Sequence, residues 1–184
     1  MKFSVVANTQ HSEIKKVLTK VIGFLDDFEL EEKTADMVGL KGVILEELQG
    51  DIIISLGGDG TLLYIFSKLN KPIFGINCGG VGFLAEMEHT DDIFTAIKNL
   101  EKGNFLKQKL QRIDTYINEN HVGSALNEVV LHSSRVARIQ GFEINIDGRI
   151  FAIRTPRVFG LFVMRNHRDR LRLALGFFLG RRWL

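Results

Sequence analysis

The chain has 184 residues, of which 45% are hydrophobic and 25% are charged, and its formal net charge is +2. This length and composition suit one globular domain or two small ones. The single cysteine excludes an internal disulfide, and no segment approaches the ~20 apolar residues of a membrane-spanning helix. We therefore expect a cytoplasmic protein.

The first half of the chain predicts alternating strands and helices. Residues 3–7 predict a strand, and residues 12–25 have the three-four apolar spacing of an amphipathic helix with Ser12 as a possible cap. A short strand near Phe28 and a helix near residues 43–48 follow. This alternation favours an α/β domain.

The stretch DIIISLGGDGT, residues 51–61, is the central motif. Its isoleucine run predicts a strand buried on both faces, as in a parallel sheet. Gly57, Gly58 and Gly60 predict a turn that lets a ligand approach the bare backbone, and Thr61 would cap the next helix. Strand, glycine turn and helix in this order are typical of phosphate binding in open α/β sheets.

Asp59 places a carboxylate inside this glycine turn. A carboxylate beside phosphate groups meets like-charge repulsion, unless a metal ion intervenes or the carboxylate takes a proton from an attacking hydroxyl. Either role indicates phosphoryl transfer. The alternative is a tight turn in which Asp59 makes a local hydrogen bond.

A second glycine-rich turn follows in KPIFGINCGGVGFLAE, residues 71–86. Residues 72–76 predict another buried strand, so two neighbouring strands would end in glycine turns that form the walls of one crevice. The alternative is that these glycines serve loop geometry alone. Cys78 has no base near it in sequence, so we expect an inert thiol rather than a nucleophile. A helix beginning at Thr90 and stopped by Gly103 closes the first domain.

After residue 104 the apolar period changes from about four to two, which predicts strands. These strands cover residues 106–117, 124–132 and a hairpin that turns at residues 147–148. Asn127 and Glu128 begin the second of them, where an amide and a carboxylate suit an adenine edge or ribose hydroxyls; the alternative is a strand-end cap. The predicted domains are residues 1–104 (α/β) and 105–152 (the start of a β-rich domain).

Three motifs together resemble those of the NAD kinase family. They are GGDGT at residues 57–61, GINCGGVGFLAE at residues 75–86 and ALNEVVLH at residues 125–132. GGDG is shared with diacylglycerol and sphingosine kinases, whereas the other two motifs are more specific. The resemblance covers residues 1–152. It implies an α/β, Rossmann-like N-terminal domain of the NAD kinase and diacylglycerol kinase type, followed by an incomplete all-β domain.

The resemblance also implies an activity. The family transfers the γ-phosphate of ATP, or polyphosphate in some members, to the adenosine ribose 2′-hydroxyl of NAD, which gives NADP. It implies Asp59 as general base and a divalent cation such as Mg²⁺, to which we assign no protein ligand. The residues implied to contact the phosphoryl donor are Gly57, Gly58, Gly60 and Thr61. The residues implied to contact NAD are Asp59, Gly60, Phe83, Asn127, Glu128 and Arg138. The family is usually oligomeric, and we expect neither nucleic acid nor a membrane as a partner.

Residues 153–184 depart from the family pattern. They hold eight arginines and no lysine, and they lack the expected Asp-Gly pair and TGSTAY-like segment. Our hypothesis is an aberrant tail of unknown fold, read out of frame, in a chain with low stability and little or no kinase activity. One alternative is a basic amphipathic segment for a membrane surface. The alternatives for the whole chain are a non-catalytic nucleotide-binding remnant and another GGDG-type kinase.

Overall fold

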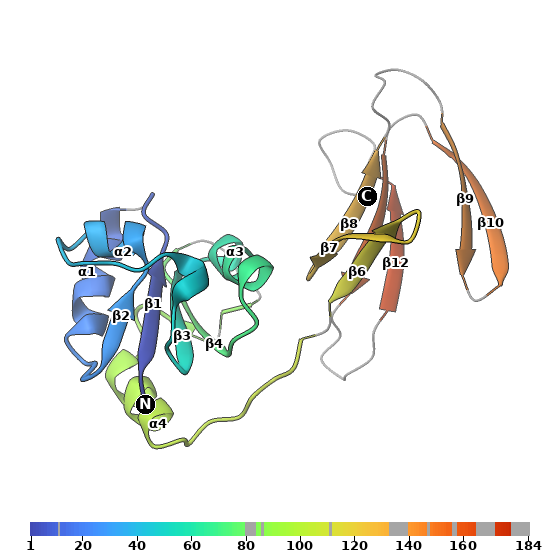
Figure 1. The fold of residues 1–184 in the computed structure, drawn as a ribbon. Coiled ribbons are helices and arrows are strands. Elements are labelled where there is room, and N and C mark those ends of the chain that lie inside the picture. The colour runs from blue at the N-terminus through green and yellow to red at the C-terminus, as the bar shows by residue number, and fades with distance from the viewer. Residues whose placement is uncertain are drawn as a thin grey trace. The chain divides into compact units, whose positions relative to one another are not determined.

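The computed structural model describes residues 1–10, 12–79, 84–85, 87–110, 112–132, 140–146, 148–155, 158–164 and 172–177 (Figure 1). The chain divides into two compact units, residues Met1–Lys109 and Leu110–Leu184. The domain boundary expected between residues 104 and 105 stays a prediction. None of the described helices is long and apolar enough to cross a membrane.

The first unit is built on a five-stranded parallel sheet in the order β2-β1-β3-β4-β5. Its strands are β1 (Phe3–Ala7), β2 (Phe28–Leu30), β3 (Ile52–Gly57), β4 (Ile73–Asn77) and β5 (Met87–Glu88). Its helices are α1 (Ser12–Ile22), α2 (Glu32–Asp36), the short 3-10 helix η1 (Leu45–Glu47), α3 (Asp59–Lys68) and α4 (Ile93–Glu101). The predicted α/β class is confirmed.

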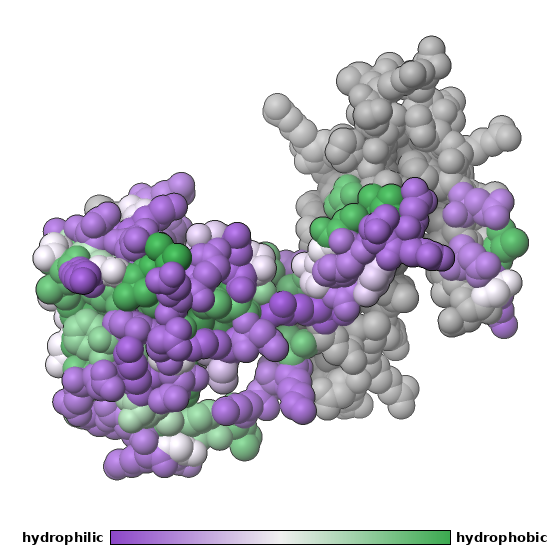
Figure 2. Space-filling model, in the orientation of Figure 1, coloured by the Kyte–Doolittle hydropathy of each residue, from purple (hydrophilic) through white to green (hydrophobic). Residues whose placement is uncertain are grey.

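Strand β3 lies in the middle of the sheet and is buried along its whole length. Successive side chains of a strand point to opposite faces, so Ile52 and Ile54 pack in one apolar cluster with α1 and α4. Ile53 packs on the other face with Ile65 of α3. Each such side chain contributes about 1.5–3 kcal/mol when it is removed from water. On the side shown in Figure 2, most of the described surface of this unit is hydrophilic.

The expected start of α3 is wrong. The helix begins at Asp59, its cap position is Gly58, and no side chain of the described residues caps it. Thr61 therefore lies inside the first turn, where its N–H donates to the carbonyl of Gly58 (3.0 Å). The backbone is extended at Gly58 (φ −99°) and helical from Asp59 onward. Thr61, three residues after Gly58, is therefore already part of the helix and cannot be its cap.

Other helix boundaries also differ from expectation. Helix α1 ends at Ile22, three residues before the predicted end at residue 25, and the capping role of Ser12 stays a prediction. Helix α4 begins at Ile93, three residues beyond the predicted start at Thr90. Its cap is Asp92, whose carboxylate Oδ1 accepts the N–H of Thr95 (3.1 Å). The helix expected near residues 43–48 is only the 3-10 turn η1, and α2 was not predicted.

The second unit contains only antiparallel strands in its described residues. They are β6 (Ile113–Ile117), β7 (Asn120–Ala125), β8 (Glu128–His132), β9 (Gln140–Ile146), β10 (Arg149–Thr155), β11 (Val158–Met164) and β12 (Arg172–Phe177). The predicted hairpin is confirmed: β9 and β10 pair with Ile146 opposite Arg149, and Gly148 takes φ +81° in the turn.

Two strand predictions in this unit are wrong in extent. Residues 106–110 form no strand, and β6 begins only at Ile113. The single strand expected over residues 124–132 is two strands, β7 and β8, interrupted at Leu126 and Asn127. Within the tail, β11 pairs with both β8 and β12, so residues after 152 take part in a three-stranded sheet.

A partly buried carboxylate ties together the amino ends of strands β1, β2 and β3 in the first unit. The side chain of Glu29 is only 11% exposed and accepts hydrogen bonds from Lys2 Nζ (2.6 Å), Ser4 Oγ (2.7 Å), Gly50 N (2.8 Å) and Gln49 N. Burial alone would raise the pKa of Glu29, but these donors outweigh burial and lower the pKa from 4.5 to about 2.

We expect Glu29 to make folding stability depend on acid pH. Its folded-state pKa lies below its unfolded value, so its contribution is present above pH 4.5 and is lost as pH falls towards 2. That contribution amounts to up to about 3 kcal/mol. Urea unfolding at pH 5 and pH 3 measures it: Glu29→Gln should lower stability at pH 5 and flatten the loss between the two pH values. Glu13→Gln, at a surface pair with Lys16, is the control. An unchanged pH profile in Glu29→Gln would contradict the assignment.

Candidate functional site

A cavity of about 460 Å³ opens at the carboxyl ends of β1 and β3. The strand order reverses between these two strands, because β1 has β2 on one side and β3 on the other. Open α/β sheets bind ligands at such switch points. The cavity is lined by Val6, Ala7, Asn8, Thr9, Gln10, Ile14, Glu31, Lys33, Gly57, Gly58, Gly60, Thr61, Tyr64, Cys78 and Gly79.

The two glycine turns share this cavity, as the sequence predicted. Gly57, Gly58 and Gly60 line it from the first turn, and Gly79 lines it from the second. The other predicted glycines of the second turn, Gly80 and Gly82, lie outside the described residues. The crevice between neighbouring strand ends is therefore confirmed for the described part of both turns.

The glycines of the first turn differ in what the fold requires of them. A Cβ at Gly57 would collide with Thr61 Oγ1 and lie 3.2 Å from Asn8 Cβ, so packing alone requires glycine there. At Gly60 a Cβ meets no described atom within 4 Å, and at Gly58 only the carbonyl of Gly79, at 3.9 Å. Packing within the described residues does not require a bare backbone at Gly58 or Gly60. A ligand that approaches the backbone closely would require it.

Asp59 lies between these glycines, but it does not itself line the cavity. Its side chain is half-buried, and its Oδ1 accepts a hydrogen bond from the backbone N–H of Leu84 (3.1 Å). Leu84 belongs to the segment between β4 and β5. The contact therefore joins the GGDGT motif to the second motif and fixes the orientation of the carboxylate beside the cavity.

The remaining predicted site residues fall in the second unit or outside the described residues. Asn127 is half-buried and directly precedes β8, and Glu128 is the first residue of that strand. Phe83 and Arg138 lie outside the described residues. Contacts of these four residues with NAD stay predictions.

Cys78 lines the cavity, but its thiol is a poor nucleophile at neutral pH. Burial raises its pKa, the nearby carboxylate of Glu88 raises it further, and a backbone hydrogen bond to Gly57 lowers it only in part, so the pKa is about 11. At neutral pH the group is a neutral thiol, which is a poor nucleophile. This supports the inert role expected for Cys78.

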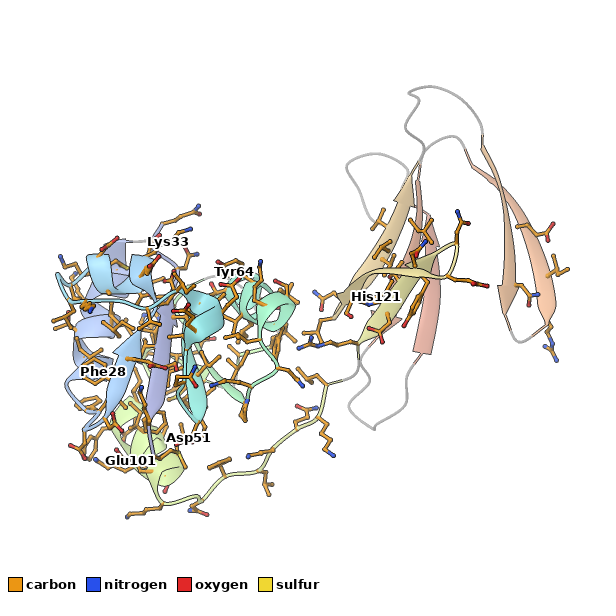
Figure 3. All side chains as sticks on the ribbon, viewed as in Figure 1. Phe28, Lys33, Asp51, Tyr64, Glu101 and His121 are labelled. Atoms are coloured by element: carbon orange, nitrogen blue, oxygen red, sulfur yellow. The ribbon has the colours of Figure 1, made fainter. Side chains whose placement is uncertain are left out.

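Lys33 and Tyr64 are among the cavity residues that the sequence did not single out. Lys33 reaches the cavity from α2, and Tyr64, 47% exposed, reaches it from α3 (Figure 3). Helix α2 has five residues and no apolar repeat, so no periodicity marks it. The sequence signal that was available is Glu31 followed three residues later by Thr34, because a carboxylate at a cap position can accept the Thr34 N–H.

Residues 26–105 match the family model described as the ATP-NAD kinase N-terminal domain. The NAD kinase of Thermoplasma acidophilum is 34% identical over 155 residues, which cover 83% of this chain and 57% of that protein. The NAD kinase of Pyrococcus furiosus is 36% identical over 159 residues, covering 80% and 57% respectively. The chain thus spans about half the length of the curated relatives it matches.

Two solved structures resemble the fold. Yeast NADH kinase in complex with NADH has a TM-score of 0.68 at 15% identity, covering 88% of this chain and 57% of that one, so it supports the fold alone. An NAD kinase from Archaeoglobus fulgidus in complex with ATP has a TM-score of 0.56 at 26% identity, covering 89% and 61%. Motifs, fold and relatives agree, and the chain belongs to the NAD kinase family.

Proposed function

We propose that this chain phosphorylates NAD at the adenosine ribose 2′-hydroxyl with ATP as donor, giving NADP. The observation that carries the proposal is the bare backbone at Gly58 and Gly60, at the rim of a cavity of about 460 Å³ and without a packing reason among the described residues. It lies at the start of the ten-residue helix α3, where the helix dipole favours anions. Family membership and the ATP complex of a relative support the same assignment.

In the proposed reaction, the ribose 2′-oxygen attacks the γ-phosphorus of ATP, the bond to the β-phosphate oxygen breaks, and ADP leaves. Asp59 accepts the hydroxyl proton as general base, and the Leu84 N–H holds its carboxylate in place. The proposed donor contacts are Gly57, Gly58, Gly60 and Thr61. The proposed NAD contacts are Asp59, Gly60, Phe83, Asn127, Glu128 and Arg138.

Phosphoryl transfer needs positioning and charge neutralisation more than covalent work by the protein. The described residues contain no group of three or more His, Cys, Asp or Glu side chains placed to hold a metal ion. We propose that Mg²⁺ enters as the MgATP complex and that its chemistry there is neutralisation of phosphate charge. We further propose a cytoplasmic homo-oligomer with no nucleic-acid or membrane partner.

A second candidate is a nucleotide-binding protein without turnover. Residues 153–184 favour it, because they carry eight arginines and no lysine and lack the family's TGSTAY-like segment. Calorimetry with MgATP, run beside an NADP-formation assay, separates the two candidates. Binding together with NADP formation supports the kinase, and binding without it supports the second candidate.

Gly60→Ala should separate stability from binding. The methyl group meets open space within the fold and removes backbone freedom from the unfolded chain, so the free energy of unfolding should rise by up to about 1 kcal/mol. MgATP should bind about tenfold more weakly or worse, because such crowding costs about 1–3 kcal/mol.

Urea unfolding and calorimetry measure the two effects of Gly60→Ala. The matched control is Gly123→Ala in β7, where a Cβ also meets no described atom within 4 Å. That variant should leave MgATP affinity unchanged. If Gly60→Ala binds MgATP as tightly as the wild type does, close approach of the donor to the backbone does not explain the glycine at position 60.

A further inference from the structure

The described lining of the cavity offers one cation for a highly charged donor. ATP carries three to four negative charges on its phosphates, and these require neutralisation wherever they bind. Among the described lining residues, Lys33 is the only lysine or arginine, and Glu31 is the only aspartate or glutamate. Whether the cavity can bind an anion therefore depends on whether Lys33 and Glu31 pair with each other or with other groups of the protein.

Glu31 is engaged by the protein itself. The residue is only 6% exposed, and its Oε2 accepts hydrogen bonds from the Thr34 N–H (3.0 Å) and from Thr34 Oγ1 (2.9 Å). The carboxylate thus caps α2 rather than pairing with Lys33. No ion pair joins Lys33 to any carboxylate of the described residues, and its side chain is exposed.

The fold fixes the backbone that carries Lys33. Thr34 is fully buried, and its Oγ1 also accepts the N–H of Ala7, the last residue of β1 (2.8 Å). The Ala35 N–H donates to the carbonyl of Glu31 (2.8 Å). These bonds tie the first turn of α2 to the carboxyl end of β1, where the cavity opens. Lys33 lies between Glu31 and Thr34, so the contact of α2 with β1 fixes the position of its backbone.

We propose that Lys33 binds the phosphate chain of the donor, with the Glu31 and Thr34 hydrogen bonds as the device that positions it. A lysine ammonium is a compact charge on a flexible stem, and it binds phosphate as a point charge. Figure 3 shows Lys33 and Tyr64 at the same end of the sheet, and both line the cavity with the glycine turn. This inference rests on the proposed donor site and adds the residue that neutralises the donor.

Calorimetric titration of the full chain tests the proposal with two probes, MgATP and inorganic tripolyphosphate. Lys33→Ala should weaken both by about tenfold to hundredfold, the usual size of a charge-assisted hydrogen bond. Lys33→Arg should restore most of the affinity. The control is Lys41→Ala, an exposed lysine outside the cavity lining, which should bind both probes within about twofold of wild type. Circular dichroism should show each variant folded, because both side chains are exposed.

Three results would overturn the proposal. The first is a wild-type chain that binds neither probe, and the second is Lys33→Ala binding both within about twofold of wild type. The third is a Lys33→Ala variant that loses MgATP binding but keeps tripolyphosphate binding, which would place Lys33 against the nucleoside. Failure of the proposed function gives a different pattern: Lys33-dependent MgATP binding without NADP formation leaves this inference intact.

Discussion

Asp59→Asn should lower kcat for NADP formation by about a hundredfold to ten-thousandfold, the range of a lost general base. The amide keeps the size of the side chain, and its oxygen can still accept the Leu84 N–H, but it cannot take the ribose proton. MgATP affinity should stay equal or become tighter, because a negative charge beside the phosphates is removed. A large loss of kcat without a loss of donor binding is the signature of a base.

The assay for Asp59→Asn needs a parent protein with measurable turnover. We would use the chain itself and a chimera in which the residues after 152 are replaced by the corresponding region of the Thermoplasma acidophilum NAD kinase. Asp36→Asn, at the exposed end of α2, is the control and should keep the parent's kcat. If the chimera retains more than about a tenth of its kcat after Asp59→Asn, the carboxylate is not the base.

Thr34→Val should lower the free energy of unfolding by about 2–4 kcal/mol, although valine has nearly the same shape. Thr34 is fully buried, and its hydroxyl joins the Ala7 N–H (2.8 Å) to the Glu31 carboxylate (2.9 Å). Without the hydroxyl, the buried N–H of Ala7 loses its hydrogen-bond acceptor. The buried Glu31 carboxylate loses one of the two hydrogen bonds that it accepts from Thr34. The same variant should weaken MgATP binding, because Lys33 loses its positioning.

Urea unfolding monitored by circular dichroism measures the effect of Thr34→Val. Thr19→Val is the matched control, since the Thr19 hydroxyl bonds to the Lys15 carbonyl (2.9 Å) on the exposed side of α1. Its unfolding free energy should change by no more than about 0.5 kcal/mol. Thr34→Ser should recover most of the stability lost in Thr34→Val. Equal effects of valine at positions 34 and 19 would show that the buried network contributes little.

Local pattern predicted the parts of the fold in which neighbouring residues determine structure. The apolar run of β3 predicted a strand buried on both faces, and its position in the middle of a parallel sheet confirms this. The glycine turn predicted the place of the cavity, since glycines after two neighbouring parallel strands meet at one edge of the sheet. The Asp-Gly pair predicted the β9–β10 hairpin.

Contacts between distant residues decided what the sequence did not predict. Helix α2 is stabilised by the Ala7–Thr34 hydrogen bond, which joins residues 27 positions apart, so no local repeat marked the helix or its Lys33. The break between β7 and β8 falls at Leu126 and Asn127 in a run that reads as continuous strand. Thr61 was wrongly predicted as the cap of α3, because the helix begins at Asp59 with Gly58 at the cap position. Residue propensity alone does not indicate this earlier start.

The fate of labelled phosphate tests the central claim most directly. The chain and its chimera would be incubated with γ-labelled ATP and NAD, with a diacylglycerol and a sugar offered in parallel, and the products identified by mass spectrometry. We expect label on the adenosine ribose 2′-oxygen of NAD with the chain and with its chimera, and we expect Asp59→Asn to abolish it in each. Label that appears only on the lipid, on the sugar or on water would contradict it.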